Sequence, residues 1–139
     1  MWSSSVYPLA ERLNIRIKLP PVQPRSRRAH EAAHWAKHQG TFSEYNEALF
    51  RAFFERGEDI SNVDVLSRLA SDLGLDGNSL QQALDKDEYL ESVLADEREA
   101  KKLGISGVPA FVANRKAALS GVQSVENLRK LIERAPSSA

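Results

Sequence analysis

Residues Gly104–Gln123, GISGVPAFVANRKAALSGVQ, hold the pattern that decides the fold. A loop leads into Ala110–Val112, a short apolar run that is typical of a β-strand. Asn114 and Arg115 follow where a hairpin turn belongs, although Arg115 is not the glycine that a tight turn prefers. Ala117–Leu119 then provides the returning strand, so the whole stretch predicts a β-hairpin.

The residues after the hairpin predict a C-terminal helix. Ser124 is a good N-cap, because its hydroxyl oxygen can accept a hydrogen bond from the first turn. The apolar residues behind it recur at helical spacing: Val125, Leu128, Leu131 and Ile132. One helix covers only one face of a two-stranded sheet, and a hairpin alone is marginally stable. The sheet that these residues predict is therefore incomplete by itself.

The residues before the hairpin predict a run of helices, most of which end at Gly or Asn. The expected helices cover residues 8–13, 26–39, 41–56, 61–73, 76–84 and 87–103, and a strand-like stretch covers 15–19. Three of them have capping signals, at Thr41 with Glu44, at Ser61 with Asp64, and at Asp76. A stripe of alanines in the helix 26–39 suits close packing. The helix 41–56 carries most of the phenylalanines, so we expect it to be the most buried.

Composition excludes several classes of function. The 139 residues contain 19 Lys and Arg and 19 Asp and Glu, so the formal net charge is zero and a nucleic-acid or membrane partner is not expected. No apolar run has the length of a membrane span, and the N-terminal residues lack the apolar core of a signal peptide. We therefore expect a cytoplasmic protein. Cysteine is absent, which excludes a thiol nucleophile, a disulfide bond and a thiolate metal site.

The order of these segments resembles a known family. The stretch Gly104–Gln123, preceded by Ala33–Ala36, Glu47–Phe54 and Leu69–Leu75, is similar to DsbA-like thioredoxin-fold proteins, most of all to FrnE-type and 2-hydroxychromene-2-carboxylate isomerase-like members. This resemblance implies a mostly helical α/β protein with a truncated thioredoxin-like fold. Residues 1–139 would then form one partial domain, in which 25–103 are a helical insertion subdomain and 104–134 are the cis-proline loop, the hairpin and the terminal helix. In a thioredoxin sheet, the strand after the cis-proline lies between the first strand and its hairpin partner. Without that first strand, the resemblance implies that Ala110–Val112 presents an unpaired apolar edge, and we expect either a homo-oligomer through this edge or poor solution behaviour.

The resemblance also implies which functional residues are present. The family's redox motif, Cys-x-x-Cys at the start of a helix, or the serine of the isomerase relatives, would precede Met1. We therefore assign no catalytic residue, no metal and no cofactor, and we expect this oxidoreductase-like chain to be inactive alone. Val108-Pro109 matches the family's cis-proline dipeptide, so Gly107, Val108 and Pro109 are the expected contacts for an extended peptide or protein substrate. The alternative is a non-enzymatic peptide-binding or assembly module, and the reading frame upstream of Met1 distinguishes the two.

A second alternative is a zinc hydrolase. His30-Glu31-Ala32-Ala33-His34 fits the pattern H-E-x-x-H, in which two histidines one helical turn apart bind zinc and the glutamate acts as a general base. A catalytic zinc needs a third protein ligand, and His38, one turn further along the same helix, cannot close around the same ion. The plainer interpretation is a solvated His/Glu face opposite the alanine stripe, and we prefer it.

Overall fold

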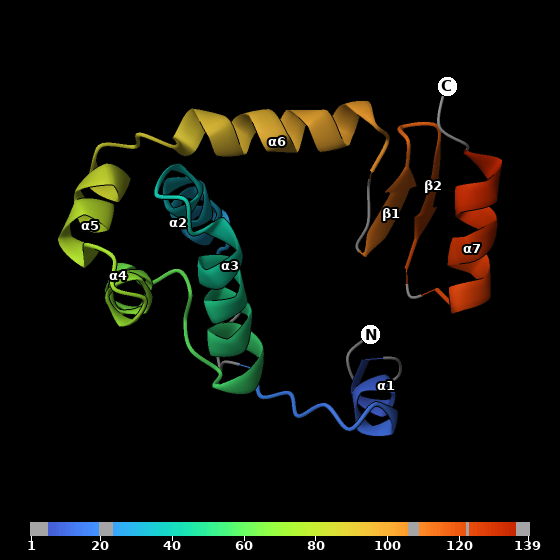
Figure 1. Ribbon diagram of the computed structural model, residues 1–139, viewed down its shortest axis with the longest axis horizontal. Helices are drawn as coiled ribbons and strands as arrows, with labels where there is room; N and C mark the ends of the chain where they lie inside the picture. Colours follow the sequence, from blue (N-terminus) through green and yellow to red (C-terminus); the bar gives the residue numbers. More distant parts are fainter. Residues whose placement is uncertain (1–5, 20–23, 106–108, 122, 136–139) are drawn as a thin grey trace. The chain divides into compact units, whose positions relative to one another are not determined.

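The computed structural model describes residues 6–19, 24–105, 109–121 and 123–135. These residues fall into two compact units, 1–93 and 94–139. The elements in chain order are α1 (Tyr7–Arg12), α2 (Arg27–His38), α3 (Phe42–Phe50), the π-helix η2 (Arg51–Glu55), α4 (Val63–Asp72), α5 (Gly77–Asp85), α6 (Leu90–Lys102), β1 (Ala110–Ala113), β2 (Ala117–Ser120) and α7 (Val125–Arg134) (Figure 1). The mostly helical α/β class predicted from the sequence is therefore confirmed.

The core of the first unit is built around α2, which contacts α3, α4 and α5. Alanines make this possible, because a helix with a stripe of small residues lets its neighbours approach closely. Ala32 and Ala36 have no exposed surface at all. The buried residues of this core are Ala29, Ala32, Ala33, Trp35, Ala36, Tyr45, Leu49, Ala52, Leu66, Leu69, Ala70, Leu80, Ala83 and Leu84.

The expectation that the helix 41–56 is the most buried is wrong. Among the described elements α2 carries six buried residues, whereas α3 carries two, Tyr45 and Leu49, and Phe50 is 56% exposed. Tyr45 is an anchor of this helix, because its fully buried hydroxyl donates a hydrogen bond to the carbonyl oxygen of Leu66 at 2.9 Å. The small side chains of α2 fit the core more completely than the large rings of α3 and η2 do.

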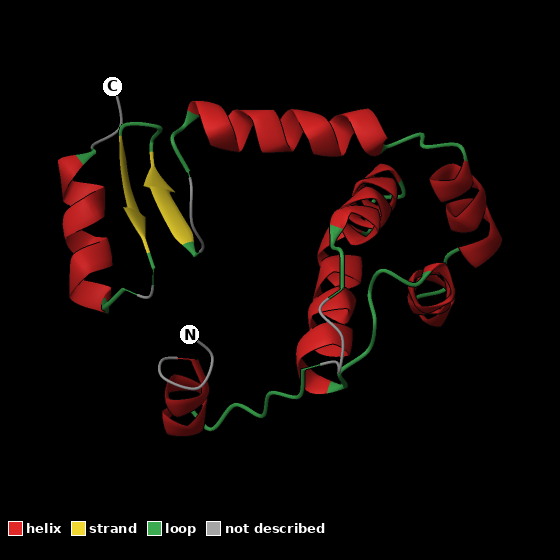
Figure 2. Cartoon of the chain, turned by 180° about the vertical axis from the view of Figure 1, so that it is seen from behind, coloured by secondary structure: helices red, strands yellow, loops and turns green. Residues whose placement is uncertain are grey.

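The second unit contains the β-hairpin and α7, which packs against both strands (Figure 2). The strands are antiparallel, with Phe111 opposite Leu119 and Val112 opposite Ala118. Ser124 caps α7 as the sequence predicts, since its Oγ accepts from the backbone N–H of Asn127 at 3.1 Å. Within α7, Leu131 is buried but Val125 is 74% exposed, so only part of the predicted apolar stripe is covered by described residues.

Candidate functional site

The hairpin turn is held by backbone geometry and by two side chains. Asn114 and Arg115 both have positive φ, at 50° and 58°, which is the conformation that a tight hairpin turn requires. The Asn114 amide donates to the carbonyl oxygen of Ala135, and the Arg115 guanidinium pairs with the Glu99 carboxylate. These contacts attach the turn to the ends of α7 and α6, so a glycine is not needed at position 115.

The outer edge of β1 is free within the described part of the chain. The backbone N–H of Gly121 donates to the carbonyl oxygen of Pro109 at 2.7 Å. Bonded and non-bonded residue pairs alternate along an antiparallel ladder, so Phe111 and Leu119 form the next bonded pair. Ala110 and Val112 therefore direct their N–H and C=O groups away from β2, and the sheet of described residues has no third strand to receive them.

An apolar hollow of about 580 Å³ lies between β1 and α7. Its walls are residues 110–114 of the hairpin and Leu128, Leu131 and Ile132 of α7, none of which is charged. Side chains beside it remain in solvent, since Val112 is 38% and Ile132 is 66% exposed. The free edge and the hollow together form a surface that can accept an extended chain, which we call the β1 edge (β1 with Leu128, Leu131 and Ile132).

The three predicted substrate contacts are only partly within the structure. Pro109 is exposed and precedes β1, where its carbonyl oxygen is fixed by Gly121. Gly107 and Val108 lie outside the described residues, and so does the peptide bond that the cis-proline prediction concerns. These assignments therefore stay predictions.

The H-E-x-x-H pattern does not form a solvated face as expected. His30 is exposed, but Glu31 is buried among the core residues of α2 and is 4% exposed. Its Oε1 atom has no hydrogen-bond partner in the described part of the chain. Burial, and then the nearby charge of Asp87, raise the pKa of Glu31 above its ordinary value. No group of three or more metal-ligating side chains occurs among the described residues, so the arrangement does not support a zinc hydrolase.

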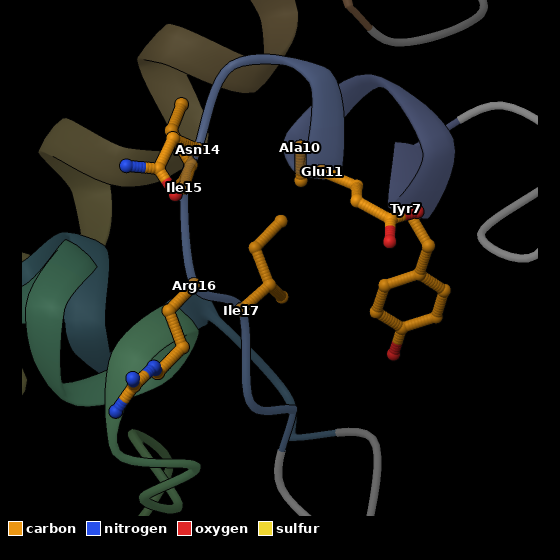
Figure 3. Close-up of a pocket in the computed structure, with 7 residues that line it drawn as sticks. All are labelled: Tyr7, Ala10, Glu11, Asn14, Ile15, Arg16 and Ile17. Atoms are coloured by element: carbon orange, nitrogen blue, oxygen red, sulfur yellow. The ribbon is translucent and has the colours of Figure 1, made fainter.

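Two further hollows belong to the first unit. One, of about 610 Å³, lies between α1 and residues 14–17; Figure 3 shows Ile17 pointing toward α1 and Arg16 pointing away from Tyr7. The other, of about 270 Å³, is lined mainly by apolar residues of α2, α3 and η2, including Leu49, Phe50 and Phe53. Sequence reasoning assigned these phenylalanines to a core face, because periodicity does not distinguish a filled core from an open hollow.

Comparison with known proteins agrees with this architecture. Residues 3–133 match the family of DSBA-like thioredoxin domains, and the chain belongs to that family. It is 36% identical over 115 residues to the uncharacterized protein YwbO of Bacillus subtilis (strain 168), a match that covers 81% of this chain and 58% of YwbO. This confirms the family predicted from the sequence, while the FrnE-type and isomerase-like detail stays a prediction.

A solved structure supports the same fold. The crystal structure of a probable DsbA oxidoreductase from Streptomyces coelicolor matches with a TM-score of 0.76 and 29% identity, over 91% of this chain and 55% of that one. The chain thus spans little more than half the length of the relatives it matches. Among the described residues, no helix is both long and apolar enough to cross a membrane.

Proposed function

We propose that this chain supplies the substrate-binding and helical part of a DsbA-like thioredoxin domain and has no thiol–disulfide activity by itself. The observation that carries the proposal is the complete absence of cysteine from a chain of this family. Disulfide exchange begins with attack by a thiolate on a disulfide sulfur. The one sulfur of this sequence is the thioether of Met1, which cannot ionise to a nucleophile.

The remaining function is recognition of extended polypeptide. Peptides bind to a free sheet edge by adding a strand, with main-chain hydrogen bonds giving affinity. The outward N–H and C=O groups of Ala110 and Val112 are such an edge. Gly107, Val108 and Pro109 directly precede β1 in the sequence, and the family resemblance supports a role for them in substrate contact. The same chain is then either one part of an oxidoreductase or a binding module without enzyme activity.

Insulin reduction by dithiothreitol tests the absence of activity. We expect the purified chain to precipitate insulin no faster than buffer, while a thioredoxin-fold protein with a Cys-x-x-Cys motif accelerates the reaction. The chain is first reduced, then treated with iodoacetamide and freed of excess reagent, because it has no thiol to alkylate whereas a contaminating Cys-x-x-Cys protein is inactivated once it has been reduced. Acceleration that survives this treatment would disprove the proposal.

Binding of a fluorescently labelled, unstructured peptide tests the recognition role. We expect saturable anisotropy changes with the unaltered chain and with Pro24→Ala, and weaker binding with Pro109→Ala. Equal binding by all three proteins would show that Pro109 does not contribute to the peptide-binding site. No binding by the unaltered chain at any concentration tested would remove the recognition role.

A further inference from the structure

We infer that the turn between α5 and α6 (residues 86–89, called the α5–α6 connector) docks on α2 in a proton-dependent way: it stays docked while the carboxyl group of Glu31 is neutral and opens when Glu31 ionises beside Asp87. The inference does not rest on the proposed function, because it concerns neither peptide recognition nor thiol chemistry. All the residues that carry it belong to the first unit.

The α5–α6 connector lies along one side of α2. Glu31 and His38 are about two helical turns apart, so their side chains leave α2 on the same side. The ring of His38 contacts the ring of Tyr89 at a centroid distance of 5.1 Å, and the charge of Asp87 acts on the carboxyl group of Glu31. Tyr89 also packs against the buried core. Two residues of α2 thus meet two residues of the connector, and docking has an apolar part as well as an electrostatic part.

The carboxyl group of Glu31 is poorly placed to carry a charge. The residue is almost entirely buried, and its Oε1 atom has no hydrogen-bond partner in the described part of the chain. Removing a carboxylate from water without a partner is costly, whereas the neutral acid avoids most of this cost. Opening of the connector would return the carboxyl group to water, so ionisation and opening favour each other.

The charges around Glu31 add to this coupling. Burial has the largest effect on its pKa and raises it; Asp87 follows and also raises it, while Arg28 and Arg27 of α2 lower it by less. The strongest of these charges therefore belongs to the connector, and it repels an ionised Glu31. Repulsion between two carboxylates pushes the connector away from α2, which is the direction that opening requires.

Asp87 is also an unfavourable residue at its own position. Its φ of 54° is a left-handed conformation that glycine and asparagine favour at the end of a helix. Its N–H group donates to the carbonyl oxygen of Leu84 at 3.2 Å, so its carboxylate lies at the C-terminus of α5, where the helix dipole opposes a negative charge. Asparagine would form the same turn without this cost, and the charge that Asp87 retains is the one that acts on Glu31.

Linkage fixes the expected pH profile. The pKa of Glu31 is raised in the docked state and takes its ordinary value of about 4.3 once the carboxyl group is hydrated. The contribution of the proton to docking is complete below the ordinary pKa and is lost as pH rises through the docked pKa. The equilibrium constant for opening should therefore rise about tenfold per pH unit between the two values and stay level on either side of them.

Amide hydrogen exchange from about pH 4 to about pH 8, corrected for the intrinsic rate of each amide, measures this constant. The reporters are the N–H groups of Glu88 and Leu90, which bond to the carbonyl oxygens of Ala83 and Asp87. The N–H of the fully buried Leu66 reports global unfolding. We expect the reporters to exchange about tenfold faster than Leu66 or more, because the connector opens without global unfolding. We also expect their exchange to rise with pH and then to level off.

Four variants identify the group that titrates. Glu31→Gln should make the pH profile level, and Asp87→Asn should reduce the rise while keeping the turn. His38→Phe retains a ring beside Tyr89 but removes a second titratable group of the same side of α2, and Glu88→Gln removes a carboxylate next to Asp87; both should leave the profile unchanged.

Four results would overturn the inference. They are reporters that exchange no faster than Leu66, a level profile in the unaltered chain, a rise that persists in Glu31→Gln, and a rise that disappears in His38→Phe. If Glu31→Gln fails to fold, Asp87→Asn decides, because its side chain is exposed and the substitution preserves the turn; an undiminished rise in that variant counts against the inference.

Discussion

Glu31 shows how one residue can combine a misleading sequence signal with an unfavourable position. Its neighbours in the chain, His30 and His34, suggested metal chemistry, yet Glu31 itself is only 4% exposed. A buried polar atom without a partner loses its hydration and gains nothing in return. The charged form of Glu31 is therefore penalised, which is why its pKa is raised.

The raised pKa of Glu31 predicts how stability depends on pH. Because the folded pKa lies above the unfolded value of about 4.3, the folded state holds the proton more tightly. The favourable contribution is complete below the unfolded pKa and is lost as pH rises through the folded pKa. We expect Glu31→Gln to raise the free energy of unfolding at neutral pH by about 1 kcal/mol, and this gain to vanish near pH 4.

Urea unfolding at several pH values measures this gain. The control is Glu88→Gln, which removes a carboxylate from an exposed position after α5. A pH-independent difference between Glu31→Gln and the unaltered chain would show that the carboxyl group is not destabilised by its burial.

At the scale of elements, close packing between helices can outweigh the intrinsic helix propensity of a residue. Gly77 lies in the first turn of α5 with no positive φ, where alanine is ordinarily the better residue by about 1 kcal/mol. A Cβ atom there would lie 2.7 Å from the backbone oxygen of Ser67 and 2.7 Å from the Oγ of Ser71. The missing side chain thus permits the close contact between α4 and α5.

We therefore expect Gly77→Ala to lower the free energy of unfolding by about 1–3 kcal/mol, against its helix propensity. Asn78→Ala is the matched substitution, because it changes the next residue of the same turn on an exposed side. Thermal unfolding followed by circular dichroism compares the two variants. A Gly77→Ala protein at least as stable as the unaltered chain would contradict the close contact.

The helix N-caps show which local predictions from the sequence are correct and which are wrong. Asp76 caps α5 as predicted, accepting from the N–H groups of Asn78 and Ser79. The next helix upstream is capped by Asn62, not by the predicted Ser61, whose hydroxyl bonds to Asp59 instead. Adjacent capping residues compete for one position, and local composition does not choose between them.

Three other element predictions failed, because contacts and backbone conformation that the sequence pattern does not show decide the outcome. Thr41 makes no capping bond to α3, since its hydroxyl lies near the carbonyl oxygen of Ala36. The alternating stretch 15–19 is not a strand, because a strand needs a partner and its Lys18 makes one backbone bond, to Phe54. Asp87 has a positive φ of 54°, so α6 begins only at Leu90.

At the scale of the whole molecule, the family and the fold class were predictable from the sequence, whereas the features of the candidate site were predictable only in part. The hairpin, its turn and α7 follow from alternation, turn residues and a cap, all of which are local signals. The free edge of β1 among the described residues was also expected, because the family resemblance places the strand that would pair with it outside this sequence. The burial of Glu31 and the hollow beside Phe50 depend on how helices meet, which a single sequence does not encode locally.

The balanced charge predicts the solution behaviour of the molecule. With a formal net charge of zero and a pI near 6.8, copies repel one another least at almost neutral pH. We expect solubility to be lowest near pH 6.8 and to rise on both sides of it. Precipitation by polyethylene glycol at fixed ionic strength, repeated across this range, measures the effect. Solubility that changes in one direction only across the range would contradict it.

The alanines of α2 have a consequence for how this lineage can diverge. Ala32 and Ala36 have no exposed surface in a close-packed core, so an added methyl group at either position has to displace neighbouring atoms. Substitutions that persist there should be confined to the smallest side chains, while the exposed positions of the same helix drift freely. An alignment of orthologous sequences is then expected to show small residues at positions 32 and 36, and this pattern would report how closely the helices pack.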